Sequence, residues 1–222
     1  MLNTSGGVAG GDRLSLTLGV GPGAAACFAS QAAERFYRAL PADPPSHVRT
    51  TLRIDAGATA EWLPQESILF DRCALDRRLD ITMAGGARFI GVESLVFGRA
   101  LMGENVTSAR LSDTIRIRRG GGLILHEAIR LNGPLAAMLA RPAIGAGMRA
   151  VATIIYVADD VDIRRDTLRE AWTDAATDCA ASAWNGMLLA RVAAPDSAAL
   201  RATIVAGLEC LRDGRALPRV WN

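Results

Sequence analysis

Leu79-Asp80-Ile81-Thr82-Met83 alternates apolar with polar side chains and runs directly into the glycine turn Ala84-Gly85-Gly86-Ala87. A period of two residues places every second side chain on the same face, as in a β-strand with one face buried. Paired glycines after such a run are typical of tight turns between strands. This stretch therefore predicts a strand that ends in a tight turn.

The same unit recurs along the first two-thirds of the chain. Further alternating runs lie at residues 14–19, 52–54 and 115–118. Runs end in a Gly-Ala step at Gly23-Ala24, Gly57-Ala58 and Gly86-Ala87, and the last two steps are followed by Glu66–Phe70 and Glu93–Phe97. Intervals of roughly 30 residues between copies predict strand pairs that stack on one another. We expect a mainly β fold, a layered, helical-type stack of strands, with an ordinary β-sandwich as the alternative.

The last third of the chain has a different composition. Met148–Val157 is one more apolar strand, and Pro134–Ala140 is a candidate for a short helix. No linker divides the sequence, so residues 1–222 are expected to form a single domain with two or three α-helices near the C-terminus.

Two longer helices are expected in this part. Arg164–Trp172 has helical composition, and Asp162 is the expected N-cap. Pro195-Asp196-Ser197 opens the second helix, and Gly214 ends it. The apolar face of this second helix consists of Leu200, Ile204, Leu208 and Leu211.

Composition excludes several classes of function. All 25 basic residues are arginines, so the phosphate-binding loop with its lysine, the Schiff base and the lysine nucleophile are all excluded. The net charge of +2 and the few aromatic residues argue against a nucleic-acid partner. The most apolar stretch, residues 150–158, is too short for a membrane span, which needs about 20 residues. We expect a protein that binds neither nucleic acid nor membrane.

Histidines and cysteines offer no metal or catalytic motif. His126 and Glu127 begin like the zinc motif H-E-x-x-H, but Arg130 stands where the second histidine is needed, and the segment is strand-like. The four cysteines are too far apart for a C-x-x-C pair and are expected to be free thiols in a reducing cytosol. We therefore predict no catalytic residues.

Carboxylates near apolar runs are the candidate functional residues. A carboxylate among apolar neighbours is costly unless it is paired, hydrogen-bonded or bound to a metal. The candidates are Glu61, Glu66, Asp71, Glu93 and Glu104. The structural alternative is that each one pairs with an arginine. Oxygen ligands alone would hold nickel or zinc weakly, which suits an ion in transit better than a resident cofactor.

Several motifs resemble the UreD (also called UreH) urease accessory proteins. They are Gly6–Leu14, Glu34–Arg38, Glu61–Phe70, Phe97–Arg99 with Met102–Glu104, and Pro218–Trp221. The resemblance covers essentially the whole chain, and the block Glu61-Trp62-Leu63-Pro64-Gln65-Glu66 is its most specific part. Family members usually begin several dozen residues earlier, so residues 1–4 look like the end of a strand and the chain looks N-terminally short.

The resemblance implies a cytoplasmic, non-enzymatic maturation factor with a β-rich, helical-type stack of strands. Such a protein binds apo-urease together with UreF and the GTPase UreG and helps to insert nickel. It holds no stable cofactor, and nickel is expected in transit along a polar internal route. The five carboxylates are our candidates for that route, inferred from this sequence. The alternatives are a carboxylate-dependent hydrolase on a β scaffold and an unrelated β-rich adaptor protein.

Overall fold

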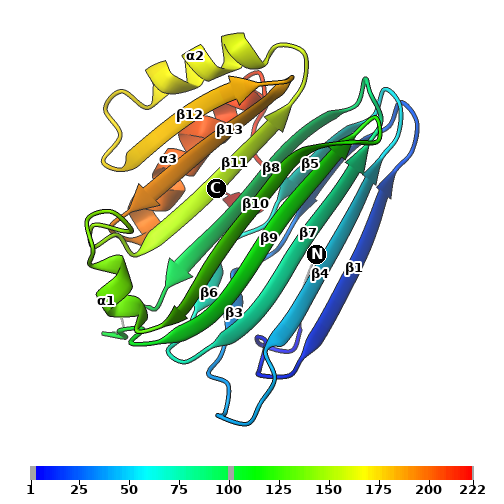
Figure 1. The fold of residues 1–222 in the computed structure, drawn as a ribbon. Helices are drawn as coiled ribbons and strands as arrows, with labels where there is room; N and C mark the ends of the chain where they lie inside the picture. The colour runs from blue at the N-terminus through cyan, green and yellow to red at the C-terminus, as the bar shows by residue number, and fades with distance from the viewer. Residues whose placement is uncertain (1–3, 100–102, 222) are drawn as a thin grey trace.

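The computed structural model describes residues 4–99 and 103–221, and in this part the chain folds into two facing β-sheets with helices on one side (Figure 1). The motif residue Met102 and the expected strand end at residues 1–3 lie outside the described residues. The architecture is mainly β, as the alternating runs predict.

The first sheet brings the predicted alternating runs side by side. Its strands, in spatial order, are β1 (Arg13–Val20), β4 (Ser46–Ile54), β7 (Ala74–Met83), β9 (Ala109–Arg119) and β10 (Gly122–Gly133). The first four strands are parallel, and β10 pairs with β9 in the antiparallel direction. One row across the sheet runs through Leu18, Leu52, Ile81 and Ile117. Copies of one sequence unit thus occupy equivalent places in successive strands.

The second sheet combines parallel and antiparallel strands. Its main path is β12 (Asp178–Trp184), β13 (Met187–Ala194), β11 (Ala150–Val157), β8 (Arg88–Phe97), β5 (Thr59–Leu63) and β2 (Ala25–Ala29). Two short strands, β3 (Glu34–Phe36) and β6 (Ser67–Leu69), pair with each other, and β6 also pairs with β8. Strand β11 confirms the predicted apolar strand. The β12–β13 hairpin was not predicted from the sequence.

The chain passes from one sheet to the other and back, so the parallel strands form successive coils. The Gly-Ala steps are the stacked corners of these coils: Thr59 N donates to Ala24 O at 2.9 Å, and Arg88 N donates to Ala58 O at 2.9 Å. The segments that begin at Glu66 and Glu93 also lie side by side. Ser67 pairs with Leu95 and not with Ser94, one residue away from the match in the sequence. The helical-type stack is therefore confirmed.

Three α-helices are present in the described residues: α1 (Leu135–Leu139), α2 (Val161–Ala171) and α3 (Ser197–Leu211). A short 3₁₀ helix, η2 (Arg219–Trp221), follows them. Asp196 caps α3 by accepting from Ala199 N at 2.8 Å, as expected. The predicted cap of α2 is wrong, because α2 begins one residue before Asp162 and Asp160 takes the cap position. The side chain of Asp160 instead contacts Tyr156 and Arg164.

The core has two layers. One apolar cluster lies between the second sheet and helices α2 and α3, with Ile154, Leu168 and Leu208 among its fully buried members. The space between the two sheets holds two further clusters, one around Leu52 and Phe89 and the other around Leu75 and Leu95. A layer of polar side chains separates these two clusters.

Candidate functional site: a polar layer between the sheets

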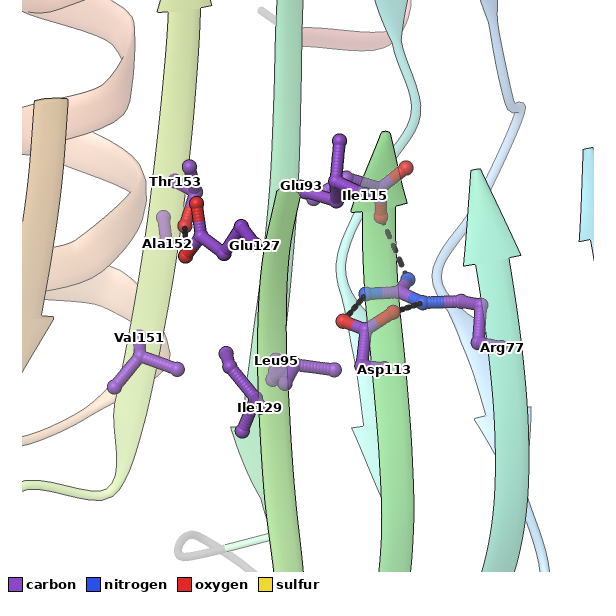
Figure 2. A pocket seen from close by; sticks show the side chains of 10 residues that line it. All are labelled: Arg77, Glu93, Leu95, Asp113, Ile115, Glu127, Ile129, Val151, Ala152 and Thr153. Atoms are coloured by element: carbon purple, nitrogen blue, oxygen red, sulfur yellow. Dashed lines mark hydrogen bonds and ion pairs between the residues drawn. The ribbon is translucent and has the colours of Figure 1, made fainter. Parts of the chain in front are cut away.

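A layer of polar side chains crosses the space between the sheets and divides its apolar core in two (Figure 2). Six neighbouring strands contribute one residue each: Ser67 from β6, Arg77 from β7, Glu93 from β8, Asp113 from β9, Glu127 from β10 and Thr153 from β11. Arg77, Asp113 and Glu127 are at most 8% exposed, and the side chain of Glu93 is 10% exposed. A buried layer with four charged groups has a solvation cost that requires partners or a function.

Strand register explains why these side chains meet. Arg77 and Asp113 are register partners on β7 and β9, and Glu93 and Thr153 are partners on β8 and β11. Residues in register point to the same face of a sheet. Both pairs lie on the faces that the two sheets turn toward each other.

Arg77 is the centre of the layer. Its Nε donates to Asp113 Oδ1 at 2.9 Å and its Nη2 donates to Asp113 Oδ2 at 2.6 Å, a bidentate pair. Its Nη1 lies 2.7 Å from Glu93 Oε2 and donates to Ser67 Oγ at 2.9 Å. Burial by itself would lower the pKa of Arg77, but Asp113 and Glu93 outweigh burial and raise it. The guanidinium therefore stays charged.

Glu93 is the one predicted carboxylate that lies in this layer. Trp62 Nε1 donates to Glu93 Oε1 at 2.7 Å, so both carboxylate oxygens have a partner. Burial raises the pKa of Glu93, Arg77 opposes the rise, and the nearby charge of Asp113 adds to it. One guanidinium thus serves two carboxylates.

Glu127 has an oxygen without a hydrogen-bond partner. Arg191 Nη1 lies 2.8 Å from Glu127 Oε1, and Thr153 Oγ1 donates to the same oxygen at 3.2 Å. Glu127 Oε2 is buried, and no hydrogen-bond partner for it is found in the described part of the chain. The residue Glu127 lines a cavity of about 10 Å³, together with Arg77, Glu93 and Asp113. That space suffices for about one water molecule.

A much larger cavity adjoins the layer on the side of the first coil, which consists of strands β1 to β3. It measures about 590 Å³ and is lined by residues of β1, β3, β4 and the segment before β3, with Arg77 and Glu93 at its inner end. Arg77 and Glu93 are the two residues that line both this cavity and the small one. Polar groups therefore continue from the large cavity past Arg77 to Glu127, and from there to Arg191, whose side chain is 58% exposed.

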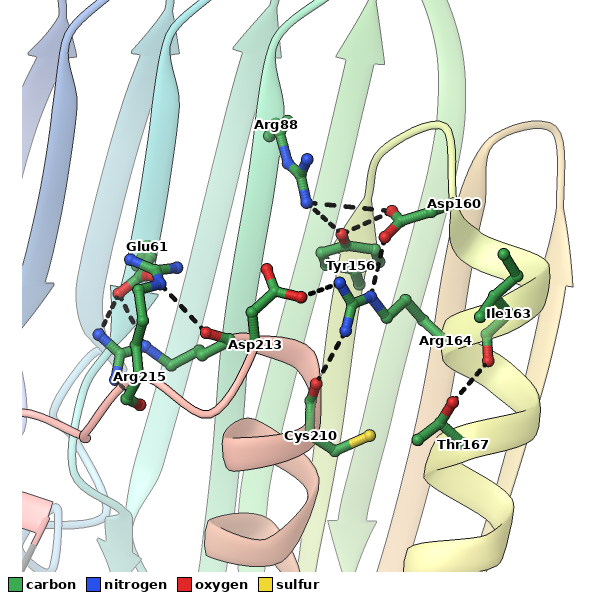
Figure 3. Close-up of polar contacts among 11 residues, drawn as sticks. Glu61, Arg88, Tyr156, Asp160, Ile163, Arg164, Thr167, Cys210, Asp213 and Arg215 are labelled. Carbon is green, nitrogen blue, oxygen red and sulfur yellow. Dashed lines mark hydrogen bonds and ion pairs between the residues drawn. The ribbon is translucent and has the colours of Figure 1, made fainter.

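Glu61 lies on the other face of the second sheet, under the C-terminal segment (Figure 3). Its Oε2 is 3.0 Å from Arg212 Nη2, and its Oε1 accepts from Arg215 Nη2 at 2.7 Å. Burial works to raise the pKa of Glu61, but hydrogen bonds and charge from Arg212, with further help from Cys27 and Arg215, lower it. Both carboxylate oxygens of Glu61 therefore pair with arginines.

The sequence block Glu61–Glu66 also contacts the end of the chain at two further places. Trp221 Nε1 donates to Leu63 O at 3.1 Å, and Gln65 Nε2 donates to Val220 O at 3.0 Å. Arg201 joins this contact by donating to Gln65 Oε1 at 2.7 Å. The most specific motif of the sequence is thus a docking strip for the C-terminal segment.

The remaining predicted carboxylates lie in loops, away from the polar layer. Asp71 Oδ1 accepts from Thr107 N at 2.7 Å and from Ser108 N at 3.1 Å, so it fixes the loop before β9. Glu104 pairs with Arg99 at 3.1 Å. Glu66 lies in a shallow pocket beside Arg201 and Trp221, and no ion pair of Glu66 is found among the described residues. The structure leaves a nickel role for these three, and for Glu61, as a prediction.

The cysteines and histidines lie in different parts of the fold. All four cysteines are free, and burial together with Glu61 raises the pKa of Cys27 to about 11, so its thiol stays protonated at neutral pH. His126 is exposed on β10 and is followed by the buried Glu127. Among residues 4–99 and 103–221, no three His, Cys, Asp or Glu side chains are grouped to hold a metal ion. In the same residues, none of the helices has the length and apolarity needed to cross a membrane.

Sequence reasoning missed Arg77, Asp113 and Glu127, although a signal is present. Arg77 interrupts the inward-facing series Leu75, Leu79 and Ile81 at its own parity. Asp113 and Glu127 interrupt the corresponding series in β9 and β10. A charged residue at the buried parity of three consecutive long strands would have identified the layer.

The fold and the site define a class of protein: two β-sheets that the chain connects as a coil, with a charged layer between them. The C-terminal segment is bound to the outer face of the second sheet. The model of the UreD urease accessory protein family matches residues 1–222. The chain therefore belongs to the UreD urease accessory protein family.

Curated relatives agree along the whole chain. The urease accessory protein UreD of Azorhizobium caulinodans is 42% identical over 221 residues, which are 100% of this chain and 80% of the relative. The protein of the same name from Xanthobacter autotrophicus is 44% identical over 223 residues, with 100% of this chain and 75% of the relative covered. Both names describe an accessory role and not a catalytic one, in agreement with the prediction that the chain is not an enzyme.

Proposed function

We propose that this chain acts in the maturation of urease as a scaffold that binds apo-urease together with UreF and UreG, and as a conduit through which nickel passes. Family membership supports the maturation role. The conduit is supported by one observation above all, the buried layer of Glu93, Asp113 and Glu127 that crosses an otherwise apolar core. The site of action is the cytoplasm, and nickel is cargo and not a resident cofactor.

The chemistry of the layer suits such cargo. Carboxylate oxygens bind Ni²⁺ less firmly than thiolates or several imidazoles would, so an ion can enter and also leave. Cysteines contribute little to such a path, since partial burial of the thiol together with Glu61 raises the pKa of Cys27 to about 11, and burial raises that of Cys73 to about 12. Of the five carboxylates that the sequence singles out, Glu93 is the strongest candidate. Asp113 and Glu127 join it on geometric grounds.

The test is nickel loading of urease in the presence of UreF and UreG. Glu93→Gln and Glu127→Gln should leave the complex assembled while lowering the nickel content and the activity of urease. Asp80→Asn is the matched control, because Asp80 pairs with Arg116 at 2.6 Å on the outer face of the first sheet, which also contains Glu127. Cys27→Ala and His126→Ala should have almost no effect. Normal loading by an assembled Glu93→Gln/Glu127→Gln variant would refute the conduit.

A further inference from the structure

Arg77 is the one basic side chain in the polar layer of the described residues, and it holds two of the three carboxylates. Its guanidinium makes the bidentate pair with Asp113 and the contact with Glu93 at 2.7 Å. Arg191 reaches Glu127 only from the rim, with a side chain that is 58% exposed. Inside the layer, therefore, three carboxylates face a single guanidinium.

One carboxylate oxygen of the layer is left without a partner in the described part of the chain. The third carboxylate, Glu127, is 7% exposed, and its Oε2 has no hydrogen-bond partner in the described residues. The residue Glu127 lines the small cavity together with Arg77, Glu93 and Asp113. If the guanidinium moved away, the carboxylates of Glu93 and Asp113 and the Ser67 hydroxyl, which all contact it, would face the space it leaves, and oxygen ligands of this kind suit a divalent cation.

The neighbouring space allows the guanidinium to move. Arg77 and Glu93 stand between the small cavity and the large one of about 590 Å³, so the side chain has room on the side of the first coil. A buried arginine leaves its carboxylates only when another positive charge replaces it, because unpaired buried carboxylates are costly. A doubly charged ion interacts twice as strongly as a single charge at the same distance.

We propose that Arg77 is a tethered counter-ion that occupies the place of the transiting metal ion, so that the carboxylates of the layer accept a divalent cation without retaining it. This inference rests on the proposed conduit. It assigns to Arg77 a positioning role: the guanidinium pairs with Asp113 and Glu93 and makes their carboxylates unavailable as a permanent metal site. The arriving ion displaces the guanidinium, and its return promotes release.

The experiment measures nickel binding to the full chain without urease. Wild type and Arg77→Gln are dialysed against NiCl₂, and bound nickel is determined before and after desalting. Arg77→Gln should bind Ni²⁺ about tenfold or more tightly than wild type, the scale on which a neighbour of metal ligands changes affinity. It should also retain nickel on the column. Arg116→Gln, which removes an arginine from an outward ion pair of the same sheet, should behave as wild type.

Two further variants keep the inference falsifiable. Arg77→Gln/Asp113→Asn should lose the added nickel affinity. If Arg77→Gln does not fold, Arg77→Lys preserves the charge but loses the bidentate fork, and it should bind Ni²⁺ more tightly than wild type. A folded Arg77 variant with wild-type nickel affinity would overturn the inference whatever urease loading shows. Tighter nickel binding by Arg77→Gln combined with normal urease loading by Glu93→Gln/Glu127→Gln would reject the conduit, and would leave only the result that Arg77 keeps a divalent cation from these carboxylates.

Discussion

At the scale of single residues, Glu61 shows how one buried carboxylate joins distant parts of the chain. The side chain is 3% exposed and bonds Arg212 and Arg215, which lie some 150 positions later (Figure 3). Arg212 is itself 6% exposed and also donates to Arg215 O at 2.9 Å. Because Glu61 and Arg212 are both buried, loss of the carboxylate leaves the Arg212 charge in a site that water reaches poorly.

Glu61→Gln should destabilise the folded chain by about 3 kcal/mol, because breaking a buried ion pair from one side leaves the other charge unpaired. For a chain of this length that corresponds to a Tm lower by about 6–12 °C. Thermal unfolding followed by circular dichroism measures the change. Glu66→Gln is the control and should be nearly silent. Equal Tm values for Glu61→Gln and wild type would mean that the ion pairs of Glu61 with Arg212 and Arg215 do not stabilise the folded chain.

The same ion pair should make stability depend on pH at the acid end. The folded-state pKa of Glu61 is lowered, mainly because Arg212 outweighs the effect of burial, so the carboxylate binds a proton more weakly in the folded than in the unfolded chain. Its contribution is therefore complete above the unfolded value of about 4.3 and is lost as pH falls through the folded value. Urea unfolding should show a constant difference between wild type and Glu61→Gln from pH 7 to about pH 5. Below about pH 4 the difference should shrink.

At the scale of elements, local chemistry predicted most strands and all three helices. Alternation between Leu79 and Met83 and the glycine turns define the coils, because both signals act within a few residues. The β12–β13 hairpin was not predicted because its first strand is rich in small residues and shows little alternation between apolar and polar side chains. The polar layer was not predicted for another reason. Arg77 and Asp113 are 36 positions apart in the sequence and become partners only through the register of β7 and β9.

Helix caps give a sharp test at this scale, because two aspartates with similar sequence signals differ in the structure. Asp196→Ala should destabilise the chain by about 1 kcal/mol, since it removes the 2.8 Å hydrogen bond to Ala199 N at the start of α3. Asp162→Ala should cost less, because Asp162 lies inside α2 and its exposed side chain forms a surface ion pair with Arg165. Urea unfolding of the two variants compares them. A larger loss for Asp162→Ala would mean that the cap assignment is wrong.

At the scale of the whole molecule, both sheets have an open edge in the first coil. In the described residues β1 pairs only with β4, and β2 pairs only with β5. His47 N donates to Asp12 O and Asp55 N donates to Val20 O, so the even-numbered residues of β1 direct their backbone groups toward β4. The odd-numbered ones, Thr17 among them, face the open edge.

This edge predicts how the isolated chain associates. After Arg13, strand β1 contains neither a charge nor a proline, and such an edge is a template for pairing with another chain. Thr17→Lys places a charge on the exposed side of the edge and should therefore lengthen the lag before aggregation on mild heating, with a stability change within about 0.5 kcal/mol. Thr51→Lys is the matched control, because Thr51 is the register partner of Thr17 on the interior strand β4 and carries the same new charge away from the edge. Light scattering follows both variants. If Thr51→Lys delays aggregation as much as Thr17→Lys does, net charge and not the open edge of β1 controls the association.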